Sequence, residues 1–167
     1  EVKVSDWKGT LTGIDVSTLR ENGIQPVIYL STVDRMNLNQ HHDLTEKQED
    51  GTLLWIEYNE FLKTHKLEDV HAVAVDASKK TDGSEFILEG QKSLSFTLYM
   101  KAPESDSIGK QDPTTYNNIY MQQNFLHGED ATSTGIPQFL HQDYTSLHYR
   151  VTGDIRLKKV DETDDTI

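Results

Sequence analysis

Alternation of apolar and polar side chains in the middle of the chain is the feature that most constrains its fold. Between Leu94 and Met100 every second residue is apolar, and the residues between them carry hydroxyl groups. A period of two puts the apolar side chains on one face of a strand, so this run predicts a half-buried antiparallel strand. Phe96 and Leu98 are expected to face the core.

Residues 70–77 form a second run of this kind. Val73 and Val75 alternate there with small alanines, which predicts a strand with a second layer packed closely against it. Turn-forming residues at 79–84, including Gly83, and at 89–92 lie between the two runs. Residues 70–103 therefore predict three strands that are joined by two turns and ended by Pro103.

The same signals recur along the rest of the chain. Further strands are expected at residues 2–7, 10–16 with a break at Gly13, 24–32, 52–58, 116–122, 146–151 and 154–161. Short helical turns are expected at 17–23, ended by Gly23, and at 59–65, whereas residues 36–51 are expected to form a polar loop. About nine short strand candidates with almost no helix predict an all-β fold, an Ig-like two-sheet antiparallel β-sandwich with at most one or two short helical turns.

Charge and residue usage exclude several classes of function. The net charge is −12, from 28 acidic and 16 basic side chains, so neither nucleic acid nor an anionic membrane surface is an expected partner. No apolar run approaches the ~20 residues of a membrane-spanning helix. The chain has no cysteine, which excludes disulfides, thiolate zinc sites and a cysteine nucleophile. Because it begins with Glu1 and shows no signal-peptide pattern, we expect it to be part of a longer protein.

Metal-binding and catalytic signatures are weak. His41, His42 and Asp43 are residue types that coordinate zinc or manganese, but adjacent residues rarely complete a site, and no third histidine lies at ligand spacing. The acidic residues within 104–113 lack the twelve-residue calcium-loop pattern. Phosphate-binding loops, nucleophile elbows, and zinc-protease and kinase signatures are absent. We therefore expect solvated loops, no metal, no cofactor and no enzymatic activity.

Aromatic residues leave one alternative open. Exposed side chains among Trp7, Trp55, Tyr116 and Tyr120 could stack on sugar rings, as in a carbohydrate-binding module of a secreted glycan-degrading enzyme. Packing in the core or between strands is the favoured interpretation of these four residues. A free-standing hydrolase is a further alternative, and it would require paired carboxylates in a concave site.

Several short motifs resemble modules of large wall-anchored surface proteins of Gram-positive bacteria. The motifs are VAVD at 73–76, SKKTDGSEF at 78–86, MKAP at 100–103 and YNNIY at 116–120. In such proteins these modules stand beside collagen-adhesin B-type repeats, and residues 155–164 resemble the first strand of such a repeat. The resemblance, which covers residues 7–164, implies a surface-protein module at 1–153 and a linker or first strand of a following repeat at 154–167.

The resemblance also implies location and partners. It implies an extracellular structural or adhesive segment of a protein anchored in the bacterial cell wall, which acts as a stalk or binds a host protein or glycan. Its other partners would be neighbouring modules of the same polypeptide.

Members of this family often carry an intramolecular isopeptide bond, in which a buried lysine amine attacks an Asn or Asp side chain while an acid shuttles protons. In an apolar surround the lysine pKa falls and the acid stays protonated. The candidates are Lys3, Lys8, Asn117, Asn118, Asp15, Glu57 and Asp76. No motif selects among them, and ordinary solvated side chains are the favoured interpretation. Lys159 matches the reactive lysine of the following repeat, whose partners would lie beyond Ile167.

Overall fold

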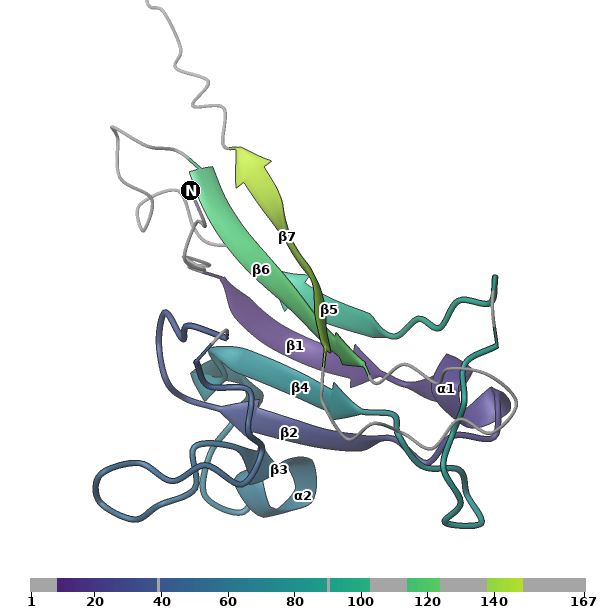
Figure 1. The fold of residues 1–167 in the computed structure, drawn as a ribbon. Helices are drawn as coiled ribbons and strands as arrows, with labels where there is room; N and C mark the ends of the chain where they lie inside the picture. The colour runs from purple at the N-terminus through teal and green to yellow at the C-terminus, as the bar shows by residue number, and fades with distance from the viewer. Residues whose placement is uncertain (1–8, 39, 90, 103–113, 124–137, 149–167) are drawn as a thin grey trace, which may run out of the picture.

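The computed structural model describes residues 9–38, 40–89, 91–102, 114–123 and 138–148; residues 114, 115, 122, 123 and 138–148 are described through their backbone only. The elements are β1 (Thr10–Asp15), α1 (Ser17–Glu21), β2 (Val27–Ser31), β3 (Ile56–Glu57), α2 (Tyr58–Phe61), a turn of 3-10 helix (Leu67–Asp69), β4 (Ala72–Asp76), β5 (Thr97–Lys101), β6 (Thr114–Gln123) and β7 (Gln138–His148) (Figure 1). Every strand pairing that the structure describes is antiparallel. The described part of the chain is thus rich in strands, and its helices are short, as the alternation predicted. No helix among these residues is long and apolar enough to cross a membrane.

Strands β3, β2 and β4 form one sheet in that order within the described residues. Leu30 lies opposite Val73, and Tyr29 lies opposite Ala74. Because side chains alternate along a strand, Leu30 and Val73 project from one face of the sheet and Tyr29 and Ala74 from the other. The strands predicted at 24–32 and 70–77 are confirmed.

Strands β1 and β5 pair with each other, although they are far apart in the sequence. Leu11 lies opposite Met100, and the register shifts between Leu11 and Gly13, where the sequence predicted a break. Thr12 Oγ1 donates a hydrogen bond to the Tyr99 carbonyl at 3.0 Å, across 87 positions of the chain. This bond holds β1 against β5 beside the shift.

One expectation about β5 is wrong. The strand begins at Thr97, so Phe96 precedes it, and the Phe96 side chain is 45% exposed. Leu98 does pack against the core, as expected. Alternation predicts facing only where neighbouring strands hold the chain extended, and here pairing with β1 extends no further back than Thr97.

Two of the three sheets, the β1–β5 pair and the β3–β2–β4 sheet, share one apolar core. Its buried residues are Leu11, Leu30, Phe61 and Val70, and half-buried side chains such as Leu98 and Val73 pack against them. Leu11 and Leu98 come from the β1–β5 pair, whereas Leu30 and Val73 come from the other sheet. Phe61, in the short helix α2, is fully buried in the same core.

A long connection between β2 and β3 covers the opposite face of the β3–β2–β4 sheet. Met36, Leu54 and Trp55 are buried there, and Tyr29, Ala72 and Ala74 pack against them. The small alanines predicted a close second layer, and that layer is supplied by this connection. A strand was predicted at 52–58, but only its residues Ile56 and Glu57 pair with β2, so the observed strand β3 is shorter.

Helix α1 ends in a Schellman motif. Gly23 has a positive φ of 75°, the Gly23 N–H donates to the Arg20 carbonyl at 2.9 Å, and the Ile24 N–H donates to the Leu19 carbonyl at 3.1 Å. Leu19 and Ile24 are buried together with Val16 in a second cluster. The end of this helical turn at Gly23 is as predicted, because glycine adopts positive φ without a Cβ penalty.

The prediction of a middle strand between the turns at 79–84 and 89–92 is wrong. Within the described residues, its only strand-like contact is an isolated bridge between Lys79 and Glu85. The turn itself is confirmed, with Gly83 at φ 83°. Ile87 is 55% exposed. Apolar residues in the sequence between these turns were therefore not sufficient for pairing with another strand.

Strands β6 and β7 form a long antiparallel ladder that confirms the strand predicted at 116–122. β7 begins at Gln138, well before the strand expected at 146–151. The strands expected at 2–7 and 154–161, and the loop expected at 104–113, lie outside the described residues.

Candidate functional site

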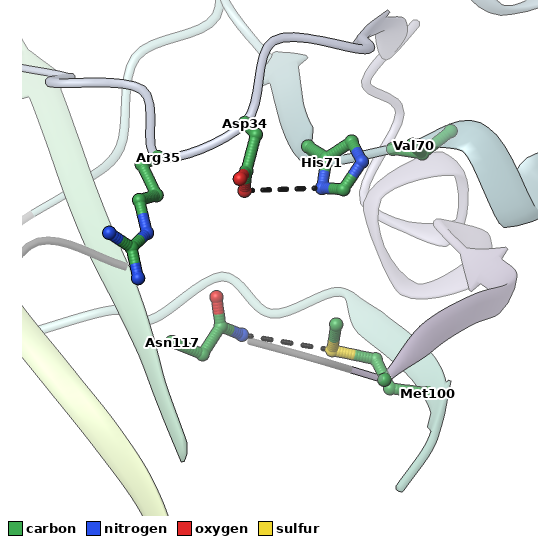
Figure 2. Close-up of a pocket in the computed structure, with 7 residues that line it drawn as sticks. Asp34, Arg35, Val70, His71, Met100 and Asn117 are labelled. Atoms are coloured by element: carbon green, nitrogen blue, oxygen red, sulfur yellow. Dashed lines mark hydrogen bonds and ion pairs between the residues drawn. The ribbon is translucent and has the colours of Figure 1, made fainter. Parts of the chain in front are cut away.

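A small pocket lies where β6 approaches the ends of the other strands. It is lined by Gly9, Asp34, Arg35, Val70, His71, Met100 and Asn117 (Figure 2). Its volume is about 30 Å³. Pockets that bind drug-sized ligands are roughly ten times larger or more.

The pairing of β2 with β4 brings the polar wall of the pocket together. Asp34 and Arg35 follow the end of β2, and His71 precedes β4. The His71 backbone N–H donates to the Ser31 carbonyl at 2.8 Å, which continues the ladder between these strands. His71 Nδ1 lies 3.6 Å from Asp34 Oδ1, an ion pair when the imidazole is protonated. Since the Asp34 side chain is 70% exposed, such a pair contributes little to stability.

Arg35 has an unusual backbone conformation. Its φ is 52°, in the left-handed region that non-glycine residues seldom occupy. This conformation costs about 1–2 kcal/mol for a residue with a Cβ atom. The turn that carries Asp34 into the pocket is therefore stabilised by its surroundings and not by local preference.

Asn117 forms the opposite wall. Its side-chain Nδ2 donates to the Met100 sulfur at 3.7 Å, which joins β6 to β5. Figure 2 shows the amide nitrogen directed at Met100 and the amide oxygen directed into the pocket. The pocket thus combines a side-chain amide, a carboxylate, an imidazole and a guanidinium.

The predicted isopeptide residues fall in different places. Asn117 lines the pocket, and Asn118, its neighbour in β6, is half-buried. Lys3, Lys8 and Lys159 lie outside the described residues. Gly9, which follows Lys8 in the sequence, lines the same pocket as Asn117. The assignment of a lysine therefore stays a prediction.

The three predicted acids do not line this pocket; Asp34 does. Asp15 Oδ1 accepts a hydrogen bond from the Ser17 backbone N–H at 2.8 Å, which lowers the pKa of that carboxyl. Asp76 Oδ1 accepts one from the Ser78 N–H at 2.9 Å. Asp34 was not among the predicted acids, because no motif in the sequence selects one acid over another. It lies two residues after the strand predicted at 24–32, and the pairing of β2 with β4 places it beside His71.

Glu57 and Asp76 instead influence Tyr29. Glu57 lies opposite Tyr29 in the β2–β3 pairing, and Asp76 lies opposite Val27, two positions along β2. The pKa of Tyr29 is raised, mainly by burial and further by the negative charges of Asp76 and Glu57. Both carboxylates therefore lie beside a phenol on the covered face of the sheet.

The residues weighed as metal ligands form local contacts. His41 Nδ1 lies 2.9 Å from Glu46 Oε1. Asp43 Oδ1 accepts hydrogen bonds from the Thr45 hydroxyl at 2.7 Å and the Thr45 N–H at 2.8 Å, and these bonds lower the pKa of Asp43. In the part of the chain that the structure describes, no three His, Asp or Glu side chains gather to hold a metal.

The aromatic candidates are mostly unsuited to stacking on sugars. Trp55 is only 2% exposed and its Nε1–H donates to the His41 carbonyl at 3.1 Å, so core packing is confirmed for this residue. Tyr116 and Tyr120 are half-buried, and Trp7 lies outside the described residues. Among side chains that the structure describes, the exposed aromatics are Phe96 and Tyr99, neither of which was a predicted sugar-stacking residue.

Comparison of the chain with protein-family models, with curated proteins and with solved structures gives no match. Function must therefore be inferred from the sequence motifs and from the geometry above.

Proposed function

We propose that the chain is an extracellular structural or adhesive module of a wall-anchored surface protein of a Gram-positive bacterium, with residues 1–153 forming an Ig-like two-sheet β-sandwich. The observation that carries this proposal is the core shared by the β1–β5 pair and the β3–β2–β4 sheet, in which Leu11 and Leu30 are both buried. A sandwich core is made in this way, from the inner faces of two antiparallel sheets. The surface-protein motifs support the location.

The site geometry favours a structural or adhesive role over an enzymatic one. The pocket around Asn117 has a volume of only about 30 Å³, and several loop carboxylates accept hydrogen bonds from their own turns. A general acid or base must face a space that admits a substrate. We accordingly assign no catalytic residues.

Surface labelling tests the proposed location. Antibodies raised against the folded chain should bind intact cells that make the protein, and brief treatment of these cells with an external protease should remove the signal. A cytoplasmic protein, labelled in parallel, should resist the same treatment. Staining that requires permeabilised cells would contradict an extracellular module.

An internal isopeptide bond is part of the proposal, with Lys3 or Lys8 joined to Asn117 or Asn118. Asn117 and Asp34 line one pocket, which favours Asn117 as the asparagine and offers Asp34 as the nearby acid. Against the bond, the exposed Asp34 lacks the apolar surround that keeps an acid protonated.

Intact mass spectrometry decides this point. The bond releases one ammonia, so the chain should weigh less than its sequence by that mass, and Asn117→Ala should restore the full mass while Asn118→Ala should not. A full sequence mass in the unmodified chain would eliminate the bond and leave the module assignment in place.

A carbohydrate-binding module is the second candidate, and exposed Tyr99 is the observation that favours it. Tyr99 is 53% exposed, and its ring lies over Gly13, where an added Cβ would be 3.3 Å from the ring. One ring gives a smaller platform than the two or three coplanar rings expected of such a module. Loss of binding to a glycan on Tyr99→Ala, with binding retained in Phe96→Ala, would support this candidate.

A further inference from the structure

The chain contains a single Asn-Gly pair, Asn22-Gly23. An asparagine followed by glycine is prone to deamidate, because glycine has no side chain to hinder attack by its backbone nitrogen. In this reaction the Gly23 nitrogen loses its proton and bonds to Asn22 Cγ, the Cγ–Nδ2 bond breaks, and ammonia leaves. Water then opens the cyclic imide to aspartate or isoaspartate. No oxidant, reductant or cofactor is needed.

In the folded chain both reacting nitrogens are engaged in hydrogen bonds. The Gly23 N–H donates to the Arg20 carbonyl at 2.9 Å, and Asn22 Nδ2 donates to the Thr18 carbonyl at 2.7 Å. The attacking nitrogen cannot lose its proton, nor the side chain turn toward it, without breaking these bonds. The exposed position of Asn22 alone would have predicted a reactive pair.

Buried side chains on both sides of the pair hold this arrangement. Leu19, three residues before Asn22, is 1% exposed, and Ile24, directly after Gly23, is fully buried. The Ile24 N–H donates to the Leu19 carbonyl at 3.1 Å, and both side chains belong to one apolar cluster. The pair can therefore react only when the end of α1 opens, and such local opening costs less than global unfolding.

We propose that Asn22 is a site of spontaneous deamidation that the C-terminal cap of α1 holds closed, so that its modification records opening of this cap. The product also weakens the cap. A carboxylate at position 22 has no N–H to donate to the Thr18 carbonyl, so the modified helix end loses the 2.7 Å bond.

Incubation of the chain at mildly alkaline pH tests the proposal directly. Peptide mapping would measure aspartate and isoaspartate at Asn22 in the native chain and in the same chain unfolded by urea. The native rate should be at least about tenfold lower, which corresponds to about 1.4 kcal/mol or more for opening the cap. Equal rates in the two states would overturn the proposal.

Two core substitutions separate opening of the cap from global unfolding. Ile24→Ala removes the side chain that anchors the cap, whereas Leu30→Ala removes a buried side chain from the core shared by the β1–β5 pair and the β3–β2–β4 sheet. At conditions of matched global stability, Ile24→Ala should deamidate several times faster than Leu30→Ala. Equal acceleration would show that modification follows global unfolding and would overturn the role of the cap. If either variant fails to fold, the comparison of native and unfolded wild-type chain still decides whether the cap protects Asn22.

Discussion

Aspartates that are followed two positions later by serine or threonine recur at turns of the described chain. In each of them the aspartate Oδ1 accepts a hydrogen bond from the backbone N–H two residues on, an Asx turn. The pairs are Asp15–Ser17, Asp43–Thr45, Asp50–Thr52, Asp76–Ser78 and Asp82–Ser84. These five carboxylates thus stabilise individual turns.

These turns should make the protein less stable in acid. The hydroxyl of Ser84 donates to Asp82 at 2.6 Å, and this bond, followed by the backbone bond, lowers the pKa of Asp82 below its ordinary value of 3.8. A carboxyl whose folded pKa is depressed contributes stability above its unfolded pKa, and the contribution is lost as the pH falls through the folded value. Urea denaturation should therefore show a stability that falls as the pH drops below about 4.

Ser84→Ala gives this prediction a residue-level check. Loss of the hydroxyl donor should raise the pKa of Asp82 toward its ordinary value in an NMR titration of the side-chain carboxyl. Ser95→Ala, at an exposed serine outside these turns, should leave that pKa unchanged. An unchanged Asp82 pKa in Ser84→Ala would mean that the Ser84 hydroxyl does not stabilise the charge.

At the scale of elements, the facing of β5 can be tested by truncation. Leu98 packs against the main core, whereas Phe96 precedes the strand and Thr97 points outward. Leu98→Ala should cost about 1–3 kcal/mol of unfolding free energy, less than for a fully buried leucine, through lost burial and a partial cavity. Phe96→Ala should cost about 1 kcal/mol or less and Thr97→Ala within about 0.5 kcal/mol.

Chemical denaturation of the three variants measures their free energies of unfolding and so the order of their stabilities. Leu98→Ala should be the most destabilised, and Phe61→Ala, at a fully buried position, sets the upper end at about 3–5 kcal/mol. If Phe96→Ala were more damaging than Leu98→Ala, the inner face of β5 would be assigned incorrectly.

For the whole molecule, folding is expected to be independent of divalent metal. A metal bound well above its dissociation constant would add several kcal/mol of stability by mass action. Treatment with a chelator should therefore leave the melting temperature nearly unchanged, with added calcium and zinc as the reverse experiment. A large drop with chelator would return His41, His42 or the acidic loops to consideration as ligands.

The module boundary gives a second prediction at this scale. Deleting residues 162–167 should leave the free energy of unfolding unchanged, because the Asp161 to Asp165 run is too charged to enter a core. In a longer chain that includes the next module, Lys159 should disappear as a free amine in peptide mapping, with loss of ammonia if its partner is asparagine. Destabilisation by the deletion would place the tail within the present module.

The sequence by itself determined the local features of this protein. Alternation identified β4, apolar and aromatic content identified β2 and β6, and glycines marked the end of α1 and the turn at Gly83, because strand propensity and positive φ depend on residues close together in the chain. Tertiary structure decided which segments meet. Three contacts join residues far apart in sequence: the pairing of β1 with β5, the packing of Trp55 against the sheet face that carries Ala74, and the pocket that Asp34 and Asn117 both line. One local pattern of apolar residues is compatible with many pairing partners. Which strands pair, and which side chains meet, therefore depends on how the apolar faces pack together in the folded chain.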